Sequence, residues 1–233
     1  MLLSQRGFEA AFKYIDMFLE GMVCTVSLSA ATVFFGFFLA LVLALMRLGK
    51  CKPLNWIASV YVEIFRATPL LVQLFIVYYI LLADLNLPTF KMFGFIRFER
   101  MIPGVIALCL NSGAYLSEII RSGIQAIDGG QTEAARSLGM TQGQNMRYIV
   151  LPQAIKNILP AIANEFVTII KESSICWTIG VQEIMFAVNS VKAATYFIGE
   201  PLIIAACVYF CLTFPTSKII AYFERRMSRG DKR

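Results

Sequence analysis

The distribution of charged residues divides this chain into long apolar segments and short polar ones. Between Glu20 and Arg47 lie 26 residues without a charge. As a helix they would be about 39 Å long, which exceeds the roughly 30 Å hydrocarbon core of a bilayer. Three further apolar runs cover residues 67–83, 102–117 and 201–223. Each run predicts a membrane-spanning helix.

One more run, from residue 161 to about residue 188, stands fourth along the chain. It is weaker because charged residues interrupt it at Glu165, Lys171, Glu172 and Glu183. Pro160 is expected to mark its start. With this run included, we predict an all-α membrane protein with about five transmembrane helices, whose membrane domain covers residues 21–223.

The first 20 residues have an amphipathic pattern. Apolar residues recur at helical spacing at positions 8, 11, 12 and 15, and charged residues occupy the opposite face. This pattern predicts a short helix that lies in the membrane interface. A polar start to one long first helix remains an alternative. At the other end, residues 224–233 form a basic tail.

Composition agrees with a membrane protein, because 58% of the residues are hydrophobic and only 15% are charged. Soluble domains carry about 25% charged residues. The net charge of +6 does not indicate nucleic-acid binding, because no basic run alternates with aromatic residues. The six cysteines lack the spacing of a zinc site, so no metal is expected.

The basic residues predict the orientation of the chain in the membrane. With five spans, 15 of the 21 Lys and Arg residues fall on one side, Lys171 among them, and six fall on the other. Cytoplasmic segments carry an excess of Lys and Arg. We therefore expect the N-terminus outside and the C-terminus in the cytoplasm.

A polar, glycine-containing segment at residues 129–154 lies between the third and fourth spans, on the predicted cytoplasmic side. Gly129 and Gly130 are expected to end the third helix. Thr132 is a candidate cap for a short helix that runs through Leu138. Gly139 suits a left-handed stop after that helix.

A second helix is predicted directly after this stop. Thr141 and Gln144 have the spacing of a capping box, which marks a helix start. Pro152 is expected to interrupt this second helix near Leu151.

The short first helix is too short to be stable alone in water, so it must dock on another surface. Ala134, Ala135 and Leu138 would give it a small, smooth face that fits a groove on a partner. Glu133 would favour the positive end of the helix dipole. The alternative is a plain connecting loop that lies against its own bundle.

The spacing of residues in this segment resembles a known motif. The pattern EAA-x3-G-x9-I-x-LP is the cytoplasmic loop motif of bacterial ABC importer permeases, and here it comprises Glu133, Ala134, Ala135, Gly139, Ile149, Leu151 and Pro152. We call residues 129–154 the EAA loop. The segments YVEIFRATPLLVQLF (61–75), SGAYLSEIIRSGIQAI (112–127) and PAIANEFVTIIKESSI (160–175) resemble the polar amino-acid permeases, the importers of histidine, glutamine and arginine. Ala67 in place of glycine and KESSI in place of KDTSL are small departures.

The resemblance implies the fold of a type I ABC importer transmembrane domain in the bacterial cytoplasmic (inner) membrane. Two such subunits, identical or paralogous, would form the pore above a dimer of ATPase subunits. An external solute-binding protein would deliver the amino acid, and the EAA loop would couple this chain to the ATPase. Because the chain has no G-x-x-x-x-G-K-[ST] sequence, ATP and Mg are expected in the partner ATPase and no cofactor in this chain.

Polar groups inside the spans are candidates for the substrate pathway, because they are costly to bury in a membrane. They are Asn111, Ser112, Tyr115 and Glu118 in the third span and Asn164, Glu165 and Lys171 in the fourth. Glu165 is the strongest candidate, since a carboxylate can bind the ammonium or basic side chain of an amino acid. Alternatively, Glu165 or Glu118 pairs with Arg121, Lys171 or a facing subunit. Nearer the cytoplasm, Glu63 and Arg66 have the spacing of an ion pair.

Other functions remain as alternatives. A permease of the same superfamily would instead carry methionine, glycine betaine or a phosphonate. An ATP-independent secondary transporter is less favoured, because the chain shows no inverted repeat. A membrane enzyme is the weakest alternative, since the chain has no histidine and no nucleophile motif.

Overall fold

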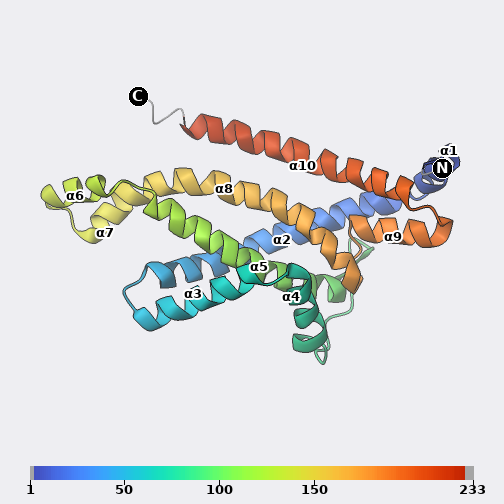
Figure 1. The fold of residues 1–233 in the computed structure, drawn as a ribbon, viewed down its shortest axis with the longest axis horizontal. Coiled ribbons are helices and arrows are strands. Elements are labelled where there is room, and N and C mark those ends of the chain that lie inside the picture. The colour runs from blue at the N-terminus through green and yellow to red at the C-terminus, as the bar shows by residue number, and fades with distance from the viewer. Residues whose placement is uncertain (1–2, 229–233) are drawn as a thin grey trace.

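The computed structural model describes residues 3–228, most of which are helical (Figure 1). The first part contains α1 (Gln5–Phe12), α2 (Ile15–Leu48), α3 (Lys52–Ala67), α4 (Leu70–Ile76) and the π-helical turn η1 (Val77–Leu81). A hairpin of β1 (Lys91–Met92) and β2 (Ile96–Arg97) leads into α5 (Phe98–Gln125), α6 (Gly129–Ser137) and α7 (Gln142–Asn145). The last part contains η2 (Met146–Val150), α8 (Leu151–Glu172), η3 (Ser173–Ile179), α9 (Ile184–Thr195) and α10 (Gly199–Ser228).

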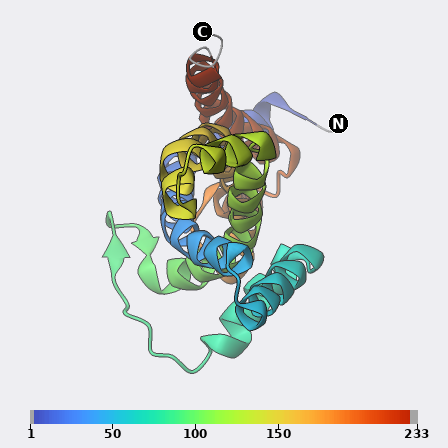
Figure 2. The ribbon, with the colours of Figure 1, turned by 90° about the vertical axis from the view of Figure 1, so that its left-hand side faces the viewer.

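Four long helices, α2, α5, α8 and α10, run along the long axis of the molecule (Figure 1). The contact between α2 and α5 is the most extensive, and α8 packs against both α5 and α10. Seen along this axis, the β-hairpin and the α3–α4 pair lie to the sides of the bundle (Figure 2). The EAA loop, with α6 and α7, forms one end of the molecule.

Small residues allow the close approach of α2 and α5. A Cβ atom added at Gly113 would lie 2.8 Å from Cδ2 of Leu39, which is too close for a real contact. A Cβ atom added at Gly36 would lie 3.6 Å from Oγ of Ser112. Small residues serve the same purpose between many membrane helices. Gly113 therefore permits the close packing of α5 against α2.

The predicted number of five spans is not confirmed. In residues 3–228, α2, α5 and α10 are long and apolar enough to cross a membrane, and there are up to four spans if the bent pair of α3 with α4 and η1 counts as one. Helix α8 is not among these helices. It is amphipathic and carries four charged residues, at positions 156, 165, 171 and 172. It nevertheless runs beside α5 along the bundle.

The boundaries of the fourth predicted span are wrong. Helix α8 begins at Leu151 and contains Pro160, which therefore does not mark the start of a span. The helix ends at Glu172, and a left-handed Gly180 (φ +85°) then turns the chain before α9. Lys171 lies in the last turn of α8, at the opposite end of that helix from the EAA loop. Lys171 and the EAA loop therefore lie at opposite ends of α8, whereas the charge count placed them on the same side.

The N-terminal segment forms a short helix of its own, as one of the two interpretations expected. Residues 13 and 14 separate α1 from α2. The Ser4 hydroxyl caps α1, and the Ser4 backbone amide donates to the Glu200 carboxylate over 2.8 Å, which ties α1 to the start of α10. Helix α2 begins at Ile15, and so includes residues that were predicted to lie before the membrane domain.

Candidate functional site

The first half of the EAA loop is helix α6. Asp128 caps it by accepting a hydrogen bond of 2.7 Å from the Gly130 amide. Gly129 and Gly130 thus begin α6 and do not end the third span, which already stops at Gln125. Here the Asp128 cap starts a helix at two glycines, although glycine more often follows the end of a helix. Glu133 consequently lies in the middle of α6, away from the positive end of the helix dipole.

The end of α6 is a Schellman motif. The Met140 amide donates to the Ala135 carbonyl over 3.0 Å, and the Gly139 amide donates to the Arg136 carbonyl over 2.9 Å. Gly139 has a φ of +81°, which confirms the predicted left-handed stop. This stop ends the helix at a fixed position and leaves Leu138 at its tip.

Leu138 is 84% exposed, although it is apolar. Ala134 lies four residues earlier on the same exposed face, whereas Ala135 is only 4% exposed and packs inside the loop. Ala134 and Leu138 are thus exposed on the face predicted to dock, whereas Ala135 is not part of that face. Successive helical residues differ by about 100° in direction, so neighbouring alanines cannot share one narrow face.

The second half of the EAA loop starts with the predicted capping box. Thr141 accepts a hydrogen bond from the Gln144 amide, and the Gln144 side chain accepts one from the Thr141 amide. Helix α7 then passes without a break through η2 into α8, so Pro152 does not interrupt it. Pro152 lies in the first turn of α8, and the π-helical turn before it provides a wider helix in which its missing N–H is tolerated.

Side-chain hydrogen bonds connect the two halves of this loop. Asn145, which is 5% exposed, donates to the Thr132 hydroxyl over 3.1 Å. Gln153 donates to the Gln131 side chain over 2.6 Å. Thr132 is therefore a tether between helices and not the cap of α6. Because of these contacts, α6 is held at a fixed position relative to the start of α8.

Of the remaining motif residues, Ile149 is half-buried, while Leu151 and Pro152 are exposed. Tyr148, which lies outside the motif, is 61% exposed. The EAA loop thus exposes the apolar side chains of Leu138, Tyr148 and Leu151. Exposed apolar residues that form a contiguous patch mark interaction surfaces.

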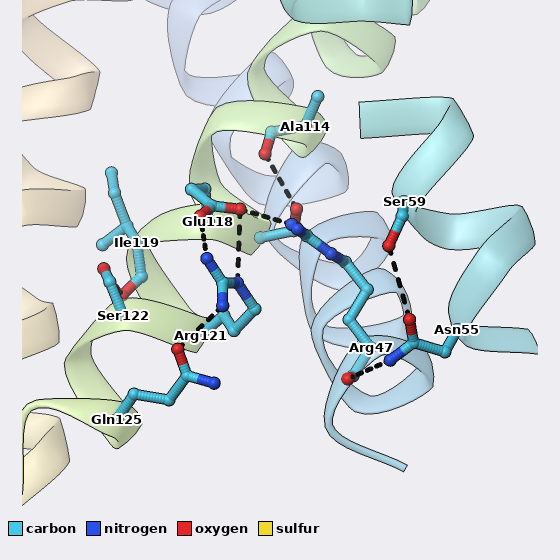
Figure 3. Close-up of polar contacts among 10 residues, drawn as sticks. Arg47, Asn55, Ser59, Ala114, Glu118, Ile119, Arg121, Ser122 and Gln125 are labelled. Carbon is cyan, nitrogen blue, oxygen red and sulfur yellow. Dashed lines mark hydrogen bonds and ion pairs between the residues drawn. The ribbon is translucent and has the colours of Figure 1, made fainter. Parts of the chain in front are cut away.

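An ionic cluster lies where α5 leads toward the EAA loop (Figure 3). Glu118 forms ion pairs with Arg121, one turn further along α5, and with Arg47 at the end of α2. Asn55 of α3 donates to the Arg47 carbonyl over 2.6 Å. Of the two alternatives for Glu118, a substrate contact or an ion pair, the structure shows the ion pair with Arg121. Glu118 therefore joins α5 to α2, and Asn55 adds α3 to the same cluster.

A second polar cluster supports the 110° bend between α3 and α4. The Gln73 side-chain amide donates to the Phe65 and Thr68 carbonyls over 2.9 and 3.0 Å. Asn111 donates in turn to the Gln73 Oε1 atom over 2.9 Å. These bonds satisfy backbone carbonyls that the bend leaves free. Asn111, a predicted pathway residue, thus holds a helix break.

The other predicted pathway residues of α5 occupy different surroundings. The Ser112 hydroxyl is buried and has no hydrogen-bond partner within residues 3–228. Tyr115 is 37% exposed, and the Arg66 guanidinium lies over its ring, 5.5 Å from the centroid. Arg66 therefore contacts an aromatic ring instead of forming the predicted ion pair with Glu63.

Glu165 is half-buried on α8, and no hydrogen-bond or ion-pair partner contacts it within the described part of the chain. Asn164 beside it is exposed and lines a cavity of about 360 Å³ between α8 and α10, together with Lys156 and Glu224. Lys171 is exposed at the end of α8 and does not pair with Glu165. Among residues 3–228, the Glu165 carboxylate thus has no counter-ion.

Some residues of these clusters were missed by sequence reasoning. Gln73 lies in the apolar run LLVQLF, and an amide in such a run is a signal that could have identified it. Asn145 and Gln153 gave no such signal, because polar residues are ordinary in a polar loop. Arg47 was considered only for its contribution to orientation.

Comparison with known proteins agrees with the geometry. The family described as binding-protein-dependent transport system inner membrane component matches residues 32–229. The arginine transport system permease protein ArtQ of Bacillus subtilis (strain 168) is 42% identical over 224 residues, which cover 96% of this chain and 98% of that protein. The L-cystine transport system permease protein TcyB of the same strain is 37% identical over 212 residues, 90% of this chain and 86% of that protein.

A solved structure is similar over nearly the whole chain. The crystal structure of an amino acid ABC transporter with histidines matches with a TM-score of 0.86 and 43% sequence identity, and the match covers 97% of this chain and 100% of that chain.

Proposed function

This chain belongs to the family of binding-protein-dependent transport system inner membrane components, and we propose that it is the permease subunit of an importer that moves a polar amino acid into the cell. It is a multi-pass protein of the bacterial cytoplasmic membrane. The energy for transport comes from ATP hydrolysis on a separate ATPase, and the EAA loop transmits the movement of that ATPase to the membrane helices.

The exposed tip of α6 supports this proposal most directly. Leu138 is 84% exposed at the end of a helix that a Schellman motif stops and two tethers hold in place. An exposed apolar side chain on a fixed backbone is suited to a groove on a partner. Because the backbone is already ordered, little conformational entropy is lost when it docks. The ATPase dimer is the partner we assign to it.

ATP and Mg are bound by that partner. The chain lacks the G-x-x-x-x-G-K-[ST] sequence of a nucleotide-binding loop. The role of this chain is to provide a path and to change its conformation when the ATPase closes.

Glu165 is the residue we propose to contact the substrate. Its half-buried carboxylate has no counter-ion in the described chain, and a charge in such surroundings needs a compensating cation. The ammonium group or a basic side chain of an amino acid supplies one. The arginine and cystine permeases among the relatives support an amino acid as the substrate, in preference to glycine betaine or a phosphonate.

The pore is formed by two permease subunits, either two copies of this chain or this chain and a paralogue. Helix α8 carries half-buried polar groups, and such groups must be covered by protein or water when they lie within a membrane. The N-terminus faces outward, where a solute-binding protein delivers the substrate, and the C-terminus faces the cytoplasm. This orientation places the EAA loop next to the ATPase.

Reconstitution tests the proposal. The permease, its ATPase and the solute-binding protein are incorporated into liposomes, and uptake of radiolabelled L-arginine, L-cystine and L-methionine is measured with and without ATP. ATP-dependent uptake of a polar amino acid is expected. Uptake that continues without the ATPase would instead identify a secondary transporter, and uptake of methionine alone would identify a different substrate class.

A further inference from the structure

Two adjoining cavities lie at the start of α5, at the opposite end of this helix from the EAA loop. Their volumes are about 640 and 310 Å³. Both are lined by Tyr78, Tyr79 and Arg100, so the Arg100 side chain forms part of the wall of each. Their sizes lie within the range of small-molecule sites, roughly 300–1,000 Å³.

The smaller cavity is positively charged. Arg97 and Arg100 both line it, and none of its lining residues is acidic. Arg100 donates hydrogen bonds to the Tyr78 hydroxyl and, over 3.3 Å, to the Ile179 carbonyl, and both acceptors are uncharged. In residues 3–228 no carboxylate pairs with either arginine. Since a guanidinium has five N–H groups, Arg100 retains donors for an anion.

An unused acceptor lies in the same wall. Gln182 lines the smaller cavity, and its Oε1 atom is buried without a hydrogen-bond donor in the described part of the chain. Buried acceptors without a donor are uncommon in proteins. The cavity therefore combines cationic groups that lack an anion with an amide oxygen that lacks a donor. A free amino acid carries both missing groups, a carboxylate and an ammonium.

We propose that Arg100, with Arg97 and Gln182 beside it, binds the α-carboxylate of the amino-acid substrate at the outer entrance of the permease. This inference rests on the proposed function and orientation. A guanidinium binds a carboxylate through two parallel hydrogen bonds, which gives both strength and a defined orientation. Because every amino acid has this carboxylate, the site binds the substrate whatever its side chain. Other groups, such as Glu165, then distinguish one side chain from another.

The test uses the assembled permease–ATPase complex in nanodiscs, without the solute-binding protein. Displacement of radiolabelled L-arginine is measured with unlabelled L-arginine and with its α-amide, in which the carboxylate is replaced by a neutral group; L-glutamine and its α-amide form a second pair. Wild type is expected to bind the acid about tenfold or more tightly than the amide, the effect of one lost charge-assisted hydrogen bond. Arg100→Gln is expected to remove this preference.

Two matched variants separate binding from a structural role. Arg100→Lys keeps a cation in the cavity wall, and it is expected to retain part of the preference for the acid. Lys91→Gln removes an exposed charge from β1, outside both cavities, and is expected to behave as wild type. If Arg100→Lys lost the preference as completely as Arg100→Gln, the charge at this position would not bind the acid and the inference would be wrong.

Three other results would overturn the inference. They are a preference that persists in Arg100→Gln, equal binding of acid and amide by wild type, and no displaceable binding at millimolar concentrations. A lipid phosphate is the other source of an anion. Native mass spectrometry that shows Arg100→Gln losing bound phospholipid, with amino-acid binding unchanged, would assign the site to a headgroup.

The same preparations separate this inference from the proposed function. Uptake is measured in parallel with liposomes that contain all three components. If no amino acid is taken up but Arg100→Gln still abolishes the preference for the acid, the site is supported and the proposed transport is wrong. If uptake is normal and the preference persists in Arg100→Gln, only the site is wrong.

Discussion

The side-chain amide of Asn145 donates a hydrogen bond to the hydroxyl of Thr132 over 3.1 Å, and this bond joins the two halves of the EAA loop. The two residues are 13 positions apart in the sequence and belong to α6 and α7. Under the proposed coupling, force applied to α6 by a docked ATPase would reach α8 through this hydrogen bond as well as through the chain.

Removal of this tether is expected to weaken coupling. Asn145→Ala deletes a buried hydrogen bond, which typically contributes about 1 kcal/mol. The expected result is reduced co-purification of the ATPase and reduced substrate-stimulated ATP hydrolysis, with normal insertion into the membrane. Gln142→Ala, an exposed change in the same short helix, serves as the control. Equal coupling in both variants would show that the tether is not required.

The ionic cluster at Glu118 is expected to stabilise the bundle. Glu118→Gln leaves Arg47 and Arg121 without their carboxylate, and loss of hydrogen bonds to charged groups costs on the order of 1–3 kcal/mol. A lower melting temperature in detergent is expected, while Glu63→Gln at an exposed position should change it little. If the melting temperature is unchanged and transport is lost, Glu118 belongs to the substrate pathway instead.

Glu165 is expected to affect transport without affecting assembly. Glu165→Gln keeps the shape of the side chain but removes the charge that the substrate would meet. The apparent affinity for uptake of a cationic amino acid such as L-arginine should fall by roughly 10–100-fold. This is the range for the loss of one charge-assisted hydrogen bond. Size-exclusion chromatography of the complex provides the control for assembly. Unchanged uptake would show that Glu165 has only a structural role.

The orientation in the membrane is open to a direct test. In a variant without native cysteines, single cysteines are placed at Gln5 and at Arg226 and treated with a membrane-impermeant reagent from outside. Labelling at position 5 and protection at position 226 are expected from the distribution of basic residues. Labelling at position 226 alone would reverse the proposed topology.

Local features with a strict backbone requirement were predictable from the sequence. The left-handed stop at Gly139 and the capping box of Thr141 and Gln144 are both present in the structure, since few other residues satisfy these geometries. The predictions for Gly129 and Pro152 were wrong, because both residues can also occupy the first turn of a helix. The Asp128 cap places Gly129 in the first turn of α6, and the π-helical turn η2 precedes Pro152 in the first turn of α8.

Features that depend on contacts between distant segments were less predictable. The intramembrane Glu118 was noted in the sequence, but its second partner, Arg47, lies 71 residues away. The bend supported by Gln73 and Asn111 likewise depends on a contact across 38 residues. Because charged residues interrupt the apolar run of α8, the pattern did not show where this helix ends, and the charge count placed Lys171 on the same side as the EAA loop.

The proposal that the EAA loop couples this permease to an ATPase depends on the geometry of Gly139. An added Cβ atom at Gly139 or at Gly143 meets no other atom within 4 Å, but only Gly139 has a positive φ, +81°. In this conformation a side chain costs about 1–2 kcal/mol, and a β-branched residue is especially unfavourable. Gly139→Val and Gly143→Val thus add the same group to the same loop with and without backbone strain.

The most direct measurement is substrate-stimulated ATP hydrolysis by the reconstituted transporter that carries each of these two variants. We expect Gly139→Val to lose the stimulation, because the tip of α6 can no longer hold its docked position, and Gly143→Val to retain it. If Gly139→Val hydrolyses ATP and transports as well as Gly143→Val and wild type do, the loop is only a connector and the proposed coupling is wrong.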